Sequence, residues 1–218
     1  MRAARLGFDL LLWARSEPEL RSAADQAASH GVDVRIGLVD VSDAAAVSSA
    51  GASSLGDAGS LRGVVVNAGG GTWTALTDLT SEEWRSTVAV NLDGAFHTIQ
   101  LALPLLLRHH QAQIVGVASD SSYFPFAGRA AYCASKAGFL SLLNTTREEL
   151  RAHGVRVTAV VPSRVDTYFR GQRPGSRPDA LSADDVADVV GSVLLAPPRI
   201  ELREIQLSAV ASPFGPFG

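Results

Sequence analysis

The sequence has little cysteine, no long hydrophobic run and no excess of charge of one sign. Its single cysteine, Cys133, excludes an internal disulfide framework. No apolar run approaches the roughly 20 residues that a membrane-spanning helix needs, and none follows a basic leader as in a signal peptide. We therefore expect a cytoplasmic protein that does not enter a membrane.

Charge is balanced along the chain, with 19 basic and 22 acidic residues and a formal net charge of -3. The basic residues are scattered rather than clustered, so the sequence shows no electrostatic footprint for nucleic acid. A length of 218 residues, 46% of them hydrophobic, is enough to bury one sizeable core. Because no segment resembles a linker, we expect residues 1–218 to form a single domain.

Short apolar segments alternate with longer segments of helical pattern. The apolar segments predict strands over 8–14, 32–39, 61–67, 112–119, 155–161 and 202–208. Several are nearly continuous apolar runs, which is typical of strands covered on both faces. This alternation predicts an α/β fold, an open parallel sheet with helices on both faces, whose ligands bind beyond the carboxyl ends of the strands. Only the tail at 211–218 lacks a pattern.

Helix boundaries are marked at several places. Ser16 and Thr80 each precede a glutamate by three residues, which is the spacing of a capping box. Gly31 and Gly154 stand where a helix would stop in a left-handed residue. These signals place helices between the predicted strands.

A tyrosine and a lysine stand four residues apart in the segment YCASK, at Tyr132 and Lys136. On a helix these positions are neighbours, and a nearby cation lowers the pKa of a phenol, which lets it act as a general acid or base. Such a pair is also common on helix surfaces by chance, so the neighbouring residues must show whether this pair is functional. The surroundings add polar groups at strand ends.

Ser119 ends one predicted strand and Asn67 ends another. The glycines after Asn67 allow the backbone to approach a ligand closely. Asn91 lies among apolar residues in a helical segment, where its amide needs partners. Since the carboxyl ends of parallel strands meet at one edge of a sheet, these groups are expected to converge there.

The sequence resembles the short-chain dehydrogenase/reductase family over almost the whole chain. The matching segments are NAG at 67–69, VNLDGAF at 90–96, IVGVAS at 114–119, YCASKAG at 132–138 and VVPSRVDT at 160–167. The resemblance implies a Rossmann-like doubly wound fold and a nicotinamide-dependent oxidoreductase that interconverts a small carbonyl compound and its alcohol. The segments occur in the family's order and spacing, which makes the assignment specific.

The resemblance also implies catalytic roles for four residues. Tyr132 gives a proton to the substrate oxygen during reduction, and Ser119 hydrogen-bonds the same oxygen. Lys136 lowers the tyrosine pKa and holds the nicotinamide ribose, while Asn91 supports a water-linked proton path to Lys136. No metal is implied.

Arg15 at the end of the strand at 8–14 points to the choice of cofactor. Family members that prefer NAD usually carry an acidic residue near there, whereas this chain has Ala14 and then Arg15, which suits the 2′-phosphate of NADP (NADPH). A solvated surface arginine is the alternative, and Asp40, matched to the adenine, could equally cap a helix. The implied cofactor contacts are Arg15, Asp40, Val41, Asn67, Ala68, Gly69, Tyr132, Lys136, Pro162, Val165 and Thr167.

The chain departs from the family pattern at its start, where the first strand and its glycine-rich turn are missing. That strand would be central to the sheet, so we expect its neighbours to be left unpaired. A wrongly assigned start, a truncation or a degenerate family member would each explain this. A catalytically silent nucleotide-binding or scaffold protein, or an epimerase, therefore stays open. A smaller departure is Ser163, where the family has a glycine after Pro162.

Two long helical segments, 81–107 and 130–150, carry more apolar residues than one stripe against a sheet requires. The family usually pairs through the corresponding helices. We therefore expect a homodimer or a homotetramer.

Overall fold

The structure is a computed structural model that describes residues 1–212, apart from the side chain of Arg170. The tail at 211–218, for which the sequence indicates no regular element, lies mostly outside the described residues.

All six predicted strands are present, and each boundary lies within two residues of its expected position. One parallel sheet pairs β1 (Leu10–Ala14) with β2 (Val34–Leu38). A second parallel sheet has the order β3 (Gly63–Val66), β4 (Gln113–Val117), β5 (Arg156–Pro162) and β8 (Glu204–Leu207). Beyond β5, a short parallel bridge joins β6 (Val165–Asp166) to β7 (Leu181–Ser182).

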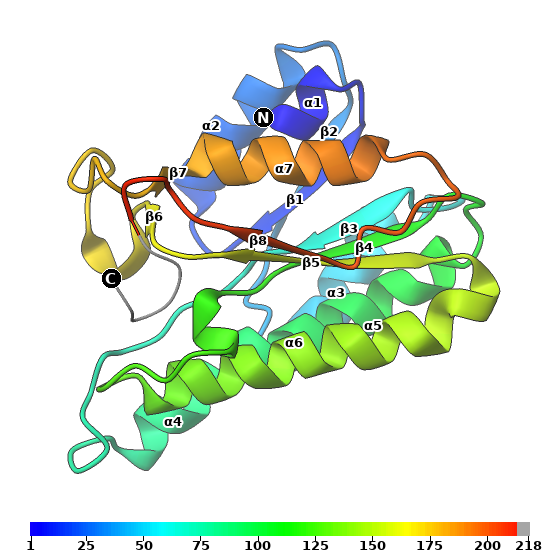
Figure 1. Ribbon diagram of the computed structural model, residues 1–218. Helices are drawn as coiled ribbons and strands as arrows, with labels where there is room; N and C mark the ends of the chain where they lie inside the picture. The colour runs from blue at the N-terminus through cyan, green and yellow to red at the C-terminus, as the bar shows by residue number, and fades with distance from the viewer. Residues whose placement is uncertain (213–218) are drawn as a thin grey trace.

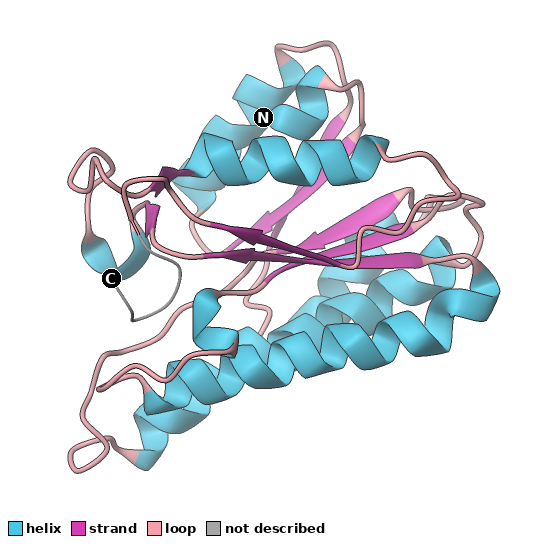
Figure 2. Cartoon of the chain, in the orientation of Figure 1, coloured by secondary structure: helices cyan, strands magenta, loops and turns pink. Residues whose placement is uncertain are grey.

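Helices cover both faces of the sheets, as the sequence predicts, and give a Rossmann-like α/β fold (Figures 1 and 2). On the upper face in Figure 1 lie α1 (Arg2–Arg5), α2 (Glu17–Ala28) and α7 (Ala183–Leu195). On the lower face lie α3 (Ala44–Leu55), α4 (Ser81–Val88), α5 (Gly94–Leu106) and α6 (Ala130–Leu150). Within residues 1–212, none of these helices combines the length and the hydropathy that crossing a bilayer would take.

The two sheets do not join along the part of the chain that the structure describes. β1 pairs only with β2, and β3 pairs only with β4, so each sheet ends in an unpaired strand edge. This is the position at which the sequence predicts a missing central strand, and the expected loss of pairing is confirmed.

The expected helix signals are confirmed with one exception. Thr80 and Glu83 form a capping box at the start of α4, and Gly31 and Gly154 adopt φ values of 80° and 71°. The capping box expected at Ser16 is wrong, because its side chain makes no capping hydrogen bond. A proline in the first turn of α2, which lacks a donor to satisfy, favours the start of that helix instead.

The main hydrophobic core lies between the four-stranded sheet and helices α5 and α6. Ile114 and Leu143 are completely buried, and Phe139 is 2% exposed. The packing is so close that a Cβ added at Gly116 would lie 2.4 Å from Leu143 Cδ1. This core fixes α6, which carries Tyr132 and Lys136, against β4.

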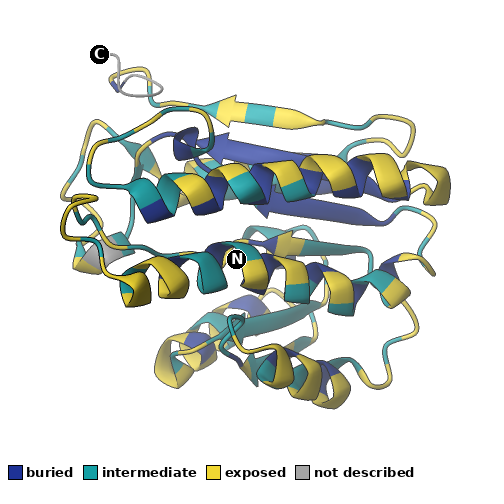
Figure 3. Cartoon of the chain, turned by 90° about the horizontal axis from the view of Figure 1, so that it is seen from below, coloured by how far each residue is buried: buried dark blue, intermediate teal, exposed yellow. Residues whose placement is uncertain are grey.

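A second core cluster lies on the opposite face of the same sheet, under α7. Val115, Val160 and Val193 are at most 2% exposed. The central strands are therefore buried on both faces, as Figure 3 shows, whereas every residue of β1 is only half-buried.

Candidate active site

The carboxyl ends of β3, β4 and β5 lie at one end of the four-stranded sheet, and the sequence-predicted residues Asn91, Ser119, Tyr132 and Lys136 gather there. The close approach of three of these side chains is seen at two glycines after β3. A Cβ added at Gly69 would lie 3.0 Å from Asn91 Oδ1 and 3.4 Å from Lys136 Nζ. A Cβ at Gly71 would lie 3.0 Å from Tyr132 Cδ2.

Asn91 lies in a π-helical turn, η1 (Ala89–Asp93), between α4 and α5. Its side chain is 1% exposed and has the partners that the sequence requires. Oδ1 accepts from Gly70 N at 2.8 Å, and Nδ2 donates to Gly70 O at 2.8 Å and to Ser135 Oγ at 2.9 Å. Asn91 therefore holds the loop after β3 against α6.

Lys136 is buried on α6, with 4% of its surface exposed. Its Nζ donates to the carbonyl of Val117, at the end of β4, at 3.0 Å. Burial lowers the pKa of this ammonium to about 8, because the charged form loses hydration. A fraction of Lys136 is therefore neutral near physiological pH.

Ser119 follows β4 and stands directly before Asp120, which is also buried. The hydroxyl of Ser119 donates to Asp120 Oδ1 at 3.0 Å and accepts from Ser121 N at 3.2 Å. This carboxylate was not expected from the sequence, where an acidic residue after a strand reads as a helix cap. In this structure the proton of Ser119 points to Asp120.

Tyr132 lies close enough to Ser119 for a hydrogen bond between them to lower its pKa. Burial outweighs that effect and raises the pKa of the phenol to about 12, and the charge of Asp120 adds to the increase. The expected lowering by Lys136 does not appear, because a lysine with a pKa of about 8 is already neutral at the pH at which a phenol with a pKa of about 12 loses its proton. The phenol is therefore protonated at neutral pH.

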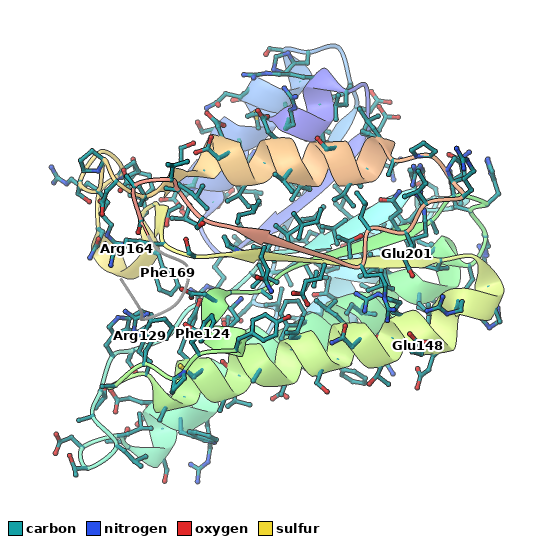
Figure 4. All side chains as sticks on the ribbon, in the orientation of Figure 1. Phe124, Arg129, Glu148, Arg164, Phe169 and Glu201 are labelled. Carbon is teal, nitrogen blue, oxygen red and sulfur yellow. The ribbon has the colours of Figure 1, made fainter. Side chains whose placement is uncertain are left out.

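An aromatic cluster surrounds Tyr132. Its ring lies 5.2 Å from that of Trp73 and 5.8 Å from that of Phe169, and Trp73 lies 5.6 Å from Phe169, all between centroids. The guanidinium of Arg129 lies 4.6 Å from the centroid of Trp73. Figure 4 labels Arg129 and Phe169 at this end of the molecule.

Sequence reasoning missed these neighbours of Tyr132. Trp73 follows the glycine triplet after Asn67, and Arg129 stands three residues before Tyr132, a spacing that makes side chains neighbours on a helix. Both signals were available. Phe169 comes from a distant loop and left no pattern.

The residues implied to bind the adenosine end of a cofactor follow the two-stranded sheet. Arg15, after β1, lies with Nη1 3.8 Å from Oδ2 of Asp40, which follows β2. Both side chains are largely accessible. Ser42 donates two hydrogen bonds to Asp40 Oδ1 and holds the pKa of that carboxyl below its usual value. Val41 packs against Gly94, where a Cβ would lie 2.7 Å from Val41 Cγ2.

The other residues implied to bind the cofactor follow β3 and β5. Asn67, Ala68 and Gly69 are exposed after β3. Pro162 is the buried last residue of β5, and Val165 and Thr167 are half-buried in the segment that follows.

A nicotinamide cofactor fits part of this arrangement. Gly70 borders open space, because a Cβ added there would meet no atom within 4 Å. Ser163 Oγ is buried with no partner among residues 1–212. The described residues fit the two ends of the cofactor. No strand in residues 1–212 pairs with both β1 and β3, so the described residues include no turn after such a strand to hold the pyrophosphate.

The adjacent histidines His109 and His110 do not form part of a metal site in residues 1–212. His109 and His110 stack with centroids 5.0 Å apart, and His109 Nδ1 accepts from the backbone of Gln111. Across residues 1–212, no group of three or more histidine, cysteine or acidic side chains could hold a metal ion.

Comparison with known proteins gives a consistent result. A family model described as short chain dehydrogenase matches residues 1–176. An uncharacterized oxidoreductase of Staphylococcus epidermidis is 31% identical over 148 residues, which cover 67% of this chain and 64% of that relative. The match thus spans slightly less than two thirds of the relative's length.

Solved structures agree over nearly the whole chain. An alcohol dehydrogenase from the archaeon Thermococcus sibiricus, complexed with 5-hydroxy-NADP, has a TM-score of 0.91 and 30% identity, covering 97% of this chain and 90% of its own. A metagenomic short-chain oxidoreductase in complex with NADP has a TM-score of 0.82 and 28% identity, covering 94% and 88%. The chain therefore belongs to the short-chain dehydrogenase family.

Proposed function

We propose that this protein is an NADP-dependent oxidoreductase that interconverts a small carbonyl compound and its alcohol, with Tyr132 as the general acid and base. The observation that carries the proposal is the gathering of Asn91, Ser119, Tyr132 and Lys136 at the carboxyl end of the four-stranded sheet. A silent scaffold has no need for a lysine kept buried at the cost of its hydration.

When bound, the nicotinamide cofactor supplies or accepts a hydride. The role of Tyr132 in reduction is to donate its proton to the substrate oxygen, and its raised pKa of about 12 keeps that proton in place at neutral pH. Ser119 supplies a second hydroxyl to the same oxygen, which stabilises the negative charge that develops there. To do so, its hydroxyl must turn away from Asp120.

Lys136 and Asn91 act around this pair. The ammonium of Lys136 lies beside the loop that would meet the nicotinamide ribose, and its charge would favour the phenolate once Tyr132 has given up its proton. Asn91 keeps that loop in place through Gly70 and Ser135. The loop after β3 thus positions Lys136, and Lys136 returns the proton that Tyr132 has given up.

Arg15 supports NADP over NAD. Its guanidinium is accessible at the end of β1, and its contact with Asp40 at 3.8 Å is a loose, solvent-screened pair. A 2′-phosphate would offer it paired charge-assisted hydrogen bonds. Two structures that resemble this chain carry NADP or a derivative of it.

A two-fold assembly through α5 and α6 is part of the proposal. Phe96 on α5 is 45% exposed and Leu107, just after that helix, is 44% exposed. These side chains offer an apolar surface that a second copy would cover. Light scattering at micromolar concentration tests this, and a monomer alone would contradict it.

The function is tested by incubating the full chain with millimolar NADPH and a panel of small aldehydes and ketones. A high cofactor concentration is used because the described residues include no pyrophosphate turn. We expect NADPH to be consumed and the matching alcohol to appear in mass spectrometry. Failure of every carbonyl in the panel to yield alcohol would favour a nucleotide-binding protein without catalysis.

A further inference from the structure

Arg129 has an unusual environment for a half-buried arginine. Its Cζ lies 4.6 Å from the centroid of Trp73 and 4.5 Å from that of Phe126. Each ring attracts the guanidinium, because the face of an aromatic ring is electronegative. The cation is thus held by two rings, and stacking of this kind occupies the faces of the planar group while leaving its edges available.

The N–H groups on those edges have no protein acceptor in residues 1–212, since the side chain of Arg129 makes no hydrogen bond or ion pair there, and none of its nitrogens is buried without a partner. Other arginines differ. The half-buried Arg62 donates to two backbone carbonyls. The buried Arg147 and Arg156 also donate to backbone carbonyls. The two rings therefore orient the guanidinium of Arg129, but no group in residues 1–212 accepts its hydrogen bonds.

This cation stands beside the proposed proton donor. Trp73 contacts both groups, with its ring 5.2 Å from that of Tyr132 and 4.6 Å from Cζ of Arg129. The positive charge of Arg129 also lowers the pKa of the Tyr132 phenol, which places the two within electrostatic reach. A molecule with its carbonyl at Tyr132 could therefore extend along Trp73 to Arg129.

The charge balance of the site favours a singly charged anion. Arg164, which lies at the same end of the molecule as Arg129 (Figure 4), is paired with Asp179 at 3.4 Å. Asp120 adds a negative charge near Tyr132. Among the side chains that the structure describes here, one unpaired cation stands next to a carboxylate, which suits a monoanion better than a phosphate dianion. A guanidinium edge also matches a carboxylate in shape.

We infer that Arg129 binds the carboxylate of the substrate, so that the preferred substrates are oxo acids and the corresponding hydroxy acids. The apolar part of the substrate lies against Trp73 and Phe169. This inference rests on the proposed function and names the substrate class of the same site.

The experiment compares pyruvate, acetoacetate and levulinate with their methyl esters in NADPH-dependent reduction by the full chain. The acids place the carboxylate at three distances from the carbonyl, and each ester removes only the charge. For the best acid, we expect Arg129→Met to lower the acid-to-ester ratio of kcat/KM by about 10- to 100-fold, the value of a lost charge-assisted hydrogen bond. Arg129→Lys should retain part of the ratio.

Arg164→Met is the matched control, because it removes the same charge from the same end of the molecule (Figure 4). Its acid-to-ester ratio should stay at the wild-type value. An equal fall of acid and ester turnover in Arg129→Met would overturn the inference, as would an equal fall in ratio for Arg164→Met. Wild-type protein that prefers the esters would overturn it too.

A binding measurement separates failure of this inference from failure of the proposed function. Tryptophan fluorescence of the protein is followed during titration with levulinate and with methyl levulinate, because Trp73 stacks on Arg129. A saturable change with the acid alone, lost in Arg129→Met, supports the carboxylate site even if no carbonyl is reduced. Reduction of esters without any acid binding would keep the function and overturn the site.

Discussion

The two sheets of this chain begin from similar sequences and end in different environments. All five residues of β1 are apolar, as are most residues of β5, yet every residue of β1 is half-buried while all seven residues of β5 are buried. The reason is the number of neighbours: β5 lies between β4 and β8, whereas β1 has β2 on one side only. An apolar run thus predicts a strand, but whether it is covered depends on what lies beside it.

The sheets also differ in what they position. The four-stranded sheet and α6 carry Ser119, Tyr132 and Lys136, which we propose take part in the chemistry. The two-stranded sheet carries Arg15 and Asp40, which we propose recognise the cofactor. Substitutions at the four-stranded sheet and α6 should therefore change turnover, whereas substitutions at the two-stranded sheet should change the affinity for the cofactor.

The largest effect is expected from Tyr132→Phe. Loss of the phenol removes a general acid, which is worth about 10²–10⁴-fold in turnover. The ring still packs against Trp73, so the melting temperature should stay near that of the wild type. Steady-state kinetics measure this, with Tyr123→Phe as the control, because the Tyr123 hydroxyl bonds to Glu204 away from the proposed chemistry. A Tyr132→Phe protein with most of its activity would remove the phenol from the mechanism.

The next effect concerns stability. Leu143→Ala should lower the free energy of unfolding by about 2–5 kcal/mol, because it opens a cavity in the main core beneath Gly116. Leu12→Ala in β1 should cost clearly less, since that side chain is only half-buried. Equilibrium unfolding in urea measures both. Equal losses would show that the two-stranded sheet is packed as tightly as the other.

A smaller effect is expected at the end of β1. Arg15→Ala should erase most of the preference for NADPH over NADH, because a charge-assisted contact to the 2′-phosphate is worth about 1.5–3 kcal/mol. This corresponds to about one to two decades in the ratio of the two dissociation constants. Calorimetric titration measures that ratio, and similar affinities for the two cofactors in the wild type would refute the role of Arg15.

The smallest effect is a dependence of stability on pH. The pKa of Lys136 is lowered to about 8 in the folded protein, against about 10.4 in an unfolded chain. Between these values the unfolded chain binds the proton that the folded one lacks. The free energy of unfolding should therefore gain up to about 1.4 kcal/mol per pH unit from this group as the pH rises.

Lys136 is the only lysine in the sequence, so no other lysine titrates in this window. Urea unfolding at pH 8, 9 and 10 should show the gain in the wild type and a flatter profile in Lys136→Met. Parallel profiles would indicate that the ammonium is better solvated than its burial implies. Measurements do not go above pH 10, because the raised pKa of Tyr132 contributes with the opposite sign there.

Much of the fold was predictable because local sequence patterns determine where its strands and helices lie. The strands follow from apolar runs bounded by glycine and polar residues, and Ser119 and Asn67 were placed correctly because they follow such runs directly. The candidate set of Asn91, Ser119, Tyr132 and Lys136 came from the resemblance to the family, because the spacing of Tyr132 and Lys136 is also common by chance. What spacing does not contain is the environment that surrounds a group after folding.

The missed features arise from contacts between distant segments or from side-chain conformations that the sequence does not specify. The pKa of Tyr132 is set by burial among Trp73 and Phe169, which come from two separate loops. The contact of Asp120 with Ser119 depends on a rotamer that adjacent positions do not specify. The capping box at Ser16 had the right residues, but its side chain takes no part in capping the helix.

The π-helical turn at Ala89–Asp93 also sets how this chain tolerates deletions. Such a turn closes its hydrogen bonds over five residues instead of four, so it holds one residue that an α-helix would exclude. Loss of a single codon there would restore regular helix and rotate α4 by about 100° relative to α5. Asn91 would then leave Gly70 without any change of its own identity. In a lineage of related genes, one in-frame deletion could therefore separate a chain that fixes the loop after β3 from one that does not.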